Sequence, residues 1–167
     1  MDSTRFQFYD PGTLADGELV LRLIERNPGN PDNGIVPEYK FEMRRPGEPE
    51  CVGAIHLRVR LTPRLAQFGG HIGYEVKEHF RGHHYAARSC RLLFPLARMH
   101  GINPILLTCA EDNAASRRTC ELAGGRLVAI RLVENELGVL RSTCYYHVVT
   151  GRVESVSQGT VPHTRHT

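Results

Sequence analysis

The chain contains no tryptophan, few aromatic residues (7%) and no long run of apolar residues. A transmembrane helix needs about 20 consecutive, mostly apolar residues, so this sequence predicts none. The N-terminus also lacks a basic stretch followed by an apolar run, which is the pattern of a secretory signal peptide. These absences predict a cytoplasmic location.

Paired cysteines are absent as well. The chain has five cysteines, an odd number, widely spaced and without a C-x-x-C pair. This pattern excludes a regular disulfide framework, a zinc ribbon and a dithiol redox motif. We therefore interpret the cysteines as small buried hydrophobes, at Cys51, Cys90, Cys109, Cys120 and Cys144.

Charge of one sign is not concentrated in any segment. Lys and Arg number 21, Asp and Glu number 18, and the net charge is +3. Binding to nucleic acid would require a basic stripe interleaved with aromatic residues, and binding to a membrane surface would require a dense basic block. Neither occurs, so we expect no nucleic acid and no membrane among the partners. An anionic small ligand fits the charge.

The bulk composition is that of a globular protein, with 41% hydrophobic and 23% charged residues in a chain of 167. This length suits one domain. The residues after position 151 are rich in Ser, Thr, His and Gly, a composition that favours disorder. We predict a single domain over residues 1–151 and a disordered tail over residues 152–167.

Four segments in the first half of the chain alternate apolar and polar residues, the pattern of half-buried strands. Turn-forming stretches such as NPGNPDNG at residues 27–34 separate them. The predicted strands span residues 18–26, 37–45, 52–61 and 71–76.

The pattern changes at Gly82. From there to His100, apolar residues recur at helical spacing, and Pro95 inside this segment predicts a kink or a break. A buried strand over residues 102–109 follows, which makes a βαβ unit whose two strands are parallel or splayed neighbours. The remaining predicted elements are a helix over residues 114–123 and strands over residues 126–133 and 139–150.

The segment from Arg81 to Ala86 reads R-G-H-H-Y-A and opens the long helix. A glycine turn before a helix presents free backbone N–H groups and the positive end of the helix dipole. Both favour an anion such as a pyrophosphate. By itself the pattern also fits an ordinary turn, so these residues alone leave both interpretations open.

Three fragments occur in the order typical of one family of acetyltransferases. They are HIGYEV from His71, RGHHYA from Arg81 and DNAASRRTCELAGG from Asp112. With them, the stretch from Gly70 to Tyr146 resembles the GNAT family of N-acetyltransferases. The resemblance implies an α/β (α+β) fold, with a mixed, mostly antiparallel sheet of about six to seven strands, a splayed parallel pair and flanking helices.

The resemblance also implies acetyl-CoA as co-substrate and no metal. Backbone amides of the helix-opening loop would bind the pyrophosphate. The preceding strand and the next helix would line the pantetheine arm. The residues that the resemblance assigns to the cofactor are Tyr74, Val76, Arg81, Gly82, His83, His84, Tyr85, Ala86, Ala87, Asn113 and Ser116.

Two positions depart from the family pattern. His84 replaces the second glycine of the pyrophosphate loop, and we expect that the helix has already begun there. Cys120 stands where many family members carry the tyrosine that protonates the departing thiolate, and we interpret it as a core thiol. Tyr145 and Tyr146 are then the candidate acids, although ordinary packing in a strand also explains them.

The implied reaction needs a base as well, because an ammonium group with a pKa near 10.4 must lose a proton before it attacks. We predict Glu75 as this base and His71 as second choice; each also fits a solvent-facing or structural polar residue. The activity that follows is direct transfer of an acetyl group from acetyl-CoA to a primary amine, of a small molecule or a protein. A non-catalytic acyl-CoA-binding or sensing module is the alternative.

The acceptor site is expected at the loops over residues 27–36 and 62–70. The family usually has two helices after its first strand, and here Pro and Gly are too frequent for them. The cleft is then either unusually open or closed by a second subunit, which leaves a homodimer open.

Overall fold

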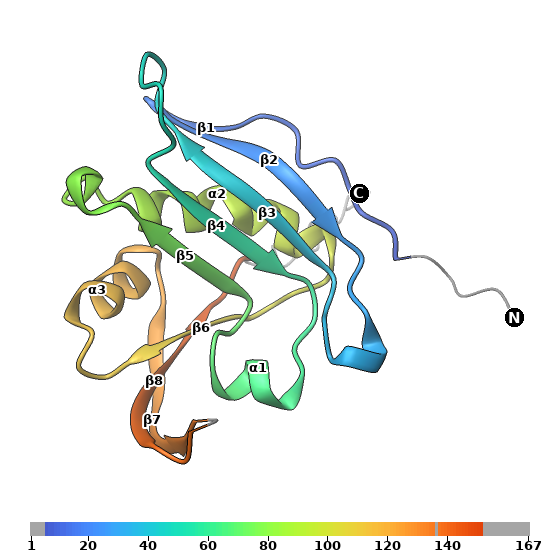
Figure 1. Ribbon diagram of the computed structural model, residues 1–167, viewed down its shortest axis with the longest axis vertical. Helices are drawn as coiled ribbons and strands as arrows, with labels where there is room; N and C mark the ends of the chain where they lie inside the picture. The colour runs from blue at the N-terminus through green and yellow to red at the C-terminus, as the bar shows by residue number, and fades with distance from the viewer. Residues whose placement is uncertain (1–5, 136, 152–167) are drawn as a thin grey trace, which may run out of the picture.

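The computed structural model describes residues 6–135 and 137–151. Within these ranges no helix is long and apolar enough to span a membrane. The predicted tail over residues 152–167 lies outside the described residues. In chain order the elements (Figure 1) are β1 (Leu14–Asp16), β2 (Leu19–Asn27), β3 (Glu38–Arg44), β4 (Gly53–Arg58), α1 (Pro63–Gln67), β5 (Ile72–Val76), α2 (Tyr85–Met99), β6 (Ile105–Ala110), α3 (Ala114–Leu122), β7 (Arg126–Glu134) and β8 (Leu140–Val148).

The first sheet has the order β1-β2-β3-β4-β5, and all neighbouring strands are antiparallel. The alternation in the sequence explains its core. In β3, for example, Tyr39, Phe41 and Met43 are buried and the charged residues between them are partly exposed. Strands β2 to β5 confirm the four predicted strands. The sequence does not predict β1, since three residues are too few to show an alternation.

The second sheet has the order β6-β8-β7, again with antiparallel pairs. Figure 1 shows it turning away from the first sheet. The described residues thus form eight strands in two sheets, where the sequence predicts about six to seven in one. The mixed class with mostly antiparallel strands and flanking helices is confirmed.

Strands β5 and β6 meet at their first residues. The N–H of His71 donates to the carbonyl of Leu106 at 2.8 Å, and the N–H of Leu106 donates to Nδ1 of His71 at 2.9 Å. Gly70 permits this approach, because its φ is +59° and a side chain there would collide with the Leu106 carbonyl. Beyond this contact the strands diverge (Figure 1), so β5 and β6 form a V whose vertex is the contact between His71 and Leu106.

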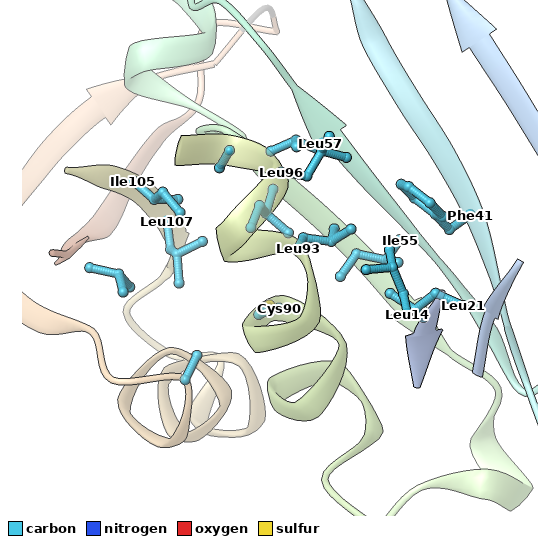
Figure 2. Close-up of a cluster of buried hydrophobic side chains, with 14 of the residues drawn as sticks. Leu14, Leu21, Phe41, Ile55, Leu57, Cys90, Leu93, Leu96, Ile105 and Leu107 are labelled. Atoms are coloured by element: carbon cyan, nitrogen blue, oxygen red, sulfur yellow. The ribbon is translucent and has the colours of Figure 1, made fainter. Parts of the chain in front are cut away.

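Helix α2 packs against both sheets. Its buried side chains, among them Cys90, Leu93 and Leu96, lie between side chains of β1 to β4 on one side and of β6 on the other (Figure 2). The helix is continuous through Pro95, so it is not divided there. It begins at Tyr85 instead of Gly82, and this later start shapes the site described below.

The segment between β4 and β5, which the sequence predicts as a loop, contains the short helix α1. Thr62 caps it by accepting a hydrogen bond from the N–H of Leu65 at 3.2 Å, and Pro63 follows at the first helical position. After α1, the N–H of Gly69 donates to Oγ1 of Thr108 at 2.8 Å. The end of α1 is thereby held against β6.

Candidate active site

A cavity of about 440 Å³ lies between β5, the start of α2 and α3, a size typical of small-molecule sites. It brings together most of the residues that the sequence assigns to a cofactor. His83 and Ala87 are outside its lining. The predicted residues that line it are Tyr74, Glu75, Val76, Arg81, Gly82, His84, Tyr85, Ala86, Asn113 and Ser116.

The start of α2 opens into this cavity with free backbone amides. The first helical hydrogen bond runs from the N–H of Arg88 to the carbonyl of His84 at 3.0 Å. The N–H groups of Tyr85, Ala86 and Ala87 therefore have no helical acceptor. No side chain within the described residues caps the helix here. These amides and the positive end of the helix dipole favour a bound anion.

His84 corrects an expectation about this loop. The sequence predicts that the helix has begun at His84, but the residue has φ 58° and ψ 27°, the left-handed conformation. Among the described residues it alone has a positive φ without being glycine. The loop thus keeps a conformation that glycine adopts freely, and a non-glycine residue pays roughly 1–2 kcal/mol for it.

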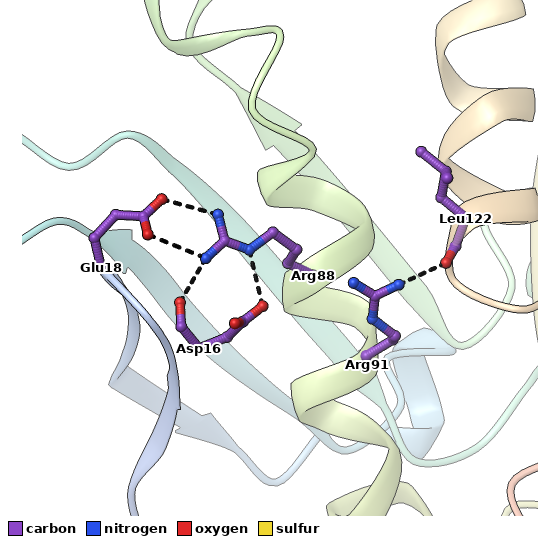
Figure 3. Close-up of polar contacts among 5 residues, drawn as sticks. All are labelled: Asp16, Glu18, Arg88, Arg91 and Leu122. Carbon is purple, nitrogen blue, oxygen red and sulfur yellow. Dashed lines mark hydrogen bonds and ion pairs between the residues drawn. The ribbon is translucent and has the colours of Figure 1, made fainter.

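Two arginines hold the loop and the helix in place. Nε of Arg81 donates to the carbonyl of Val76 at 3.1 Å, across the connection between β5 and α2. Arg88 reaches from α2 to the β1–β2 hairpin, where it contacts the carboxylates of Asp16 at 2.8 Å and Glu18 at 2.9 Å (Figure 3). The first turn of α2 is therefore tied to the far end of the first sheet.

A third arginine joins α2 to α3. Nη1 of Arg91 donates to the carbonyl of Leu122 at 2.8 Å (Figure 3). The arginine thereby pairs a carbonyl at the C-terminus of α3 and places a positive charge at the negative end of the helix dipole.

Helix α3 forms the opposite wall of the cavity. The side-chain oxygen of Asn113 accepts from the N–H of Ser116 at 3.0 Å and caps the helix. Its amide nitrogen has no partner within the described residues, so it can donate to a ligand. The hydroxyl of Tyr74, on β5, donates to the carbonyl of Ser116 at 3.5 Å and so reaches this wall. Burial raises the pKa of Tyr74.

The predicted catalytic residues do not all reach the cavity. Glu75 lines it and is exposed. The hydroxyl of Tyr145 donates to the carbonyl of Gln67 at 3.1 Å, and the hydroxyl of Tyr146 accepts from Nε of Arg117 at 3.4 Å. Neither tyrosine lines the cavity, and burial raises the pKa of both.

His71, the second choice for the base, lies where β5 and β6 meet, and it does not line the cavity. Burial, with a contribution from the charge of Arg58, lowers its pKa to about 4. The imidazole is therefore neutral near pH 7, and Nδ1 carries no proton because it accepts from the N–H of Leu106. This geometry gives His71 a structural role.

Other lining residues escape the sequence analysis. Four of them follow Asn113 on α3, and the helical spacing of three and four residues from Ala115 is the signal that could have revealed them. The fifth missed residue is Phe80, in the turn before Arg81. The missed residues are Phe80, Ala115, Arg118, Thr119 and Leu122. No group of three or more His, Cys, Asp or Glu side chains in the described ranges could hold a metal ion.

Several solved structures have a similar fold. The microcin C7 self-immunity acetyltransferase MccE, in complex with acetyl-CoA and AMP, has a TM-score of 0.54 at 18% identity, over 67% of this chain and 61% of that one. YncA from Salmonella typhimurium, a putative acetyltransferase with acetyl-CoA, has a TM-score of 0.55 at 15% identity, over 71% and 68%. A putative ribosomal-protein-serine acetyltransferase from Vibrio cholerae has a TM-score of 0.58 at 12% identity, over 84% and 99%.

At these identities the likeness shows the fold alone, and the chain spans less than two thirds of the MccE structure. A comparison with curated proteins gave no match. A family model described as acetyltransferase (GNAT) domain, however, matches residues 2–126, well over half of the chain. The sequence fragments, the fold and this match agree, and the chain belongs to the GNAT acetyltransferase family.

Proposed function

We propose that this GNAT acetyltransferase binds acetyl-CoA in the cavity between β5, α2 and α3 and transfers the acetyl group to a primary amine. The observation that carries the proposal is the uncapped start of α2, which opens into a cavity of about 440 Å³. The similar structures of MccE and YncA contain acetyl-CoA, which supports the same co-substrate here.

In this proposal the pyrophosphate lies at the start of α2. The N–H groups of Tyr85, Ala86 and Ala87 donate to its oxygens, and the loop from Gly82 contributes further amides. Arg81 borders the same cavity and adds a positive charge. Gly82 has a φ of +92° and open space where a side chain would begin, so a phosphate can approach its backbone closely.

The pantetheine arm is placed between the diverging strands β5 and β6. The N–H of Lys77 donates to the carbonyl of Val52, so the odd-numbered residues of β5 direct their backbone N–H and C=O groups to β4. Tyr74 and Val76 therefore direct their backbone N–H groups away from β4, where the arm pairs with them like an added strand. The free amide nitrogen of Asn113 donates to the arm from the other side.

The chemistry is direct attack of the amine on the thioester carbonyl. A C–N bond forms, the C–S bond breaks, and a backbone N–H of β5 polarises the carbonyl oxygen. Removing a proton from an ammonium group of pKa 10.4 at neutral pH costs about 4 kcal/mol, and Glu75, which lines the cavity, is the proposed base. No covalent enzyme intermediate is needed.

The departing thiolate needs a proton donor, and we assign this role to Tyr74. Its hydroxyl lies beside Cys120, the position of the usual family acid, and is protonated at neutral pH as a proton donor must be. Tyr145 and Tyr146, the candidates from the sequence, direct their hydroxyls to Gln67 and Arg117 instead.

Calorimetric titration with acetyl-CoA, followed by a thiol-release assay over a panel of amines, tests the proposal. Binding together with amine-dependent release of CoA is the expected result. Binding without release on any amine would favour the non-catalytic sensing module, which the buried Cys120 at the usual acid position supports. Absence of binding would contradict both.

The acceptor amine is proposed to enter from the side of α1. A second cavity of about 620 Å³ lies there, and α1 falls within the segment over residues 62–70 that the sequence assigns to the acceptor. The amine panel should include both small molecules and peptide N-termini, because both carry primary amines. The residues lining it are Arg64, Gln67, Phe68, Glu134, Asn135 and Leu137.

We also propose that residues 1–151 act as one cytoplasmic domain and that two copies associate through the edge strand β7. Ile130 and Leu132 on this strand are 44% and 64% exposed. Arg126 and Glu134 occupy its two ends, so antiparallel alignment of two β7 strands brings opposite charges near each other. Sedimentation velocity of the protein and of Leu132→Glu tests this: a dimer that the substitution dissociates is expected, and a monomer at all concentrations contradicts it.

A further inference from the structure

Three of the five cysteines meet next to the cofactor cavity. Cys109 on β6 lies opposite Cys144 in the β6–β8 ladder, and its thiol interacts both with that of Cys144 and with that of Cys120 on α3. The sequence interpretation of isolated hydrophobes misses this cluster, because the three residues belong to three separate elements. The proposed acetyl transfer uses none of the three thiols.

Cys109 differs from its neighbours in exposure and charge. Cys120 and Cys144 are 1% and 0% exposed, whereas Cys109 is partly exposed. The thiol of Cys120, the charge of Arg117 and the thiol of Cys144 lower the pKa of Cys109, while the interaction with Cys109 and burial raise the pKa of Cys120. A partly exposed thiol near a cation and a second thiol is the environment in which cysteines react with peroxides.

We propose that Cys109 is a peroxide-reactive thiol and that Cys120 resolves it to a reversible intramolecular disulfide. In the first step the Cys109 thiolate attacks hydrogen peroxide, an S–O bond forms, the O–O bond breaks, and hydroxide leaves. In the second step the Cys120 sulfur attacks the resulting sulfenic acid, the S–O bond breaks, and water leaves. Two thiols lose two electrons in total and one peroxide becomes two waters, so the reaction balances.

The geometry of the sheet favours Cys120 over Cys144 as the partner. The N–H of Glu111 donates to the carbonyl of Ser142 at 2.9 Å, two residues along from Cys109 and Cys144 in the same register. Cys109 and Cys144 are therefore a hydrogen-bonded antiparallel pair, whose Cβ atoms stand about 5.5 Å apart. A disulfide needs about 3.5–4.5 Å, and β8 is the central strand of its sheet, so it cannot shift easily.

Helix α3 is not part of the strand ladder, so the spacing between Cys120 and Cys109 is not set to that of a strand pair. It is a short helix at the cavity wall, and Cys120 lies in its last turn. The disulfide would draw this wall against β6. If acetyl-CoA binds in this cavity, as proposed above, oxidation should weaken its affinity and a thiol reductant should restore it.

The test begins with the unaltered protein, so it does not depend on the folding of a variant. Protein treated with excess hydrogen peroxide is alkylated, digested with trypsin without reduction and analysed by mass spectrometry. Arginines separate the three cysteines into different tryptic peptides, residues 99–117, 119–126 and 142–152. A linked pair of the peptides 99–117 and 119–126, absent after reduction, is expected. A link to 142–152, or no link at all, would overturn the proposal.

Two variants and an internal control sharpen the result. In Cys120→Ser the sulfenic acid at Cys109 should persist and be trapped by dimedone, whereas Cys144→Ser should still form the disulfide. Cys51 is also partly exposed and lies near Lys77, but no second cysteine accompanies it, so it controls for exposure and for a neighbouring cation. Equal reaction of Cys51 and Cys109 with peroxide would contradict the proposal. Because the mapping uses no acetyl-CoA, it can succeed or fail independently of the proposed function.

Discussion

At the scale of single residues, the imidazole of His71 serves as the hydrogen-bond acceptor that a backbone carbonyl provides elsewhere in a sheet. The N–H of Leu106 lies where β5 and β6 diverge. It would have no hydrogen-bond acceptor without Nδ1 of the imidazole. Only the neutral imidazole can do so, and burial favours that form. The hydrogen bond that joins the start of β5 to β6 thus depends on the protonation of one side chain outside the cavity.

Stability should therefore fall as His71 becomes protonated. Its pKa is about 4 in the folded protein, below the ordinary 6.5, so its contribution is complete above about pH 6.5 and is lost as the pH falls toward 4. Because the side chain is partly exposed, we expect a loss of about 1–2 kcal/mol. Urea unfolding at pH 7.5 and pH 5 measures it. His71→Asn keeps an acceptor that does not titrate, and an equal loss in this variant would contradict the assignment.

Asn113 caps α3 and is proposed to contact acetyl-CoA, and substitution can separate the two roles. Asn113→Asp keeps the oxygen that caps α3 and loses the free N–H groups, so it should keep the stability and weaken acetyl-CoA binding. Asn113→Ala loses both and should also lower the free energy of unfolding by about 1 kcal/mol. Thermal melts and calorimetry on both variants check this, and unchanged affinity in Asn113→Asp would remove the residue from the site.

The assignment of the acid predicts an order of effects. Tyr74→Phe removes the hydroxyl in the cavity wall and should lower kcat about 100-fold, as expected for loss of a general acid. Tyr146→Phe removes a buried hydroxyl outside the cavity lining and serves as the matched control. Steady-state thiol release compares them. A larger decrease in Tyr146→Phe would return the role to the candidate from the sequence.

At the scale of elements, Arg88 fixes where α2 begins. Arg88→Met removes its contacts with Asp16 and Glu18, which should lower the Tm and weaken acetyl-CoA binding, because the amides of the first turn lose their fixed position. Arg22→Met, which removes an exposed ion pair with Glu42, is the control and should change neither. Unchanged affinity in Arg88→Met would show that the first turn holds its place without this contact.

The elements themselves could be predicted wherever a local pattern is long enough. The alternation in β3 and the helical spacing around Leu93 identify their elements from sequence alone. Short elements such as β1 and α1 give no such signal. The left-handed His84 was also unpredictable, since only the tertiary arrangement, in which α2 begins at Tyr85, requires it.

At the scale of the whole molecule, the sequence predicted which residues line the cavity better than it predicted their contacts. The loop after Arg81 and the helix after Asn113 carry local motifs, and the fold brings both to one cavity. The contact of the Tyr74 hydroxyl with α3, the cluster around Cys109 and the division into two sheets depend on residues distant in sequence. No periodicity records such contacts, so the contacts of Tyr145 and Tyr146 were harder to predict than the residues that line the cavity.

The order of the strands has a consequence for synthesis on the ribosome. β1 to β5 pair in chain order, so each strand that emerges finds its neighbour already present. β6 must wait, because α3 and β7 are made before its partner β8. The wall that α3 builds on β6 is therefore completed only after β8 has emerged. A nascent chain can form its first sheet early, but a ligand of the cavity can stabilise it only once β8 has left the exit tunnel.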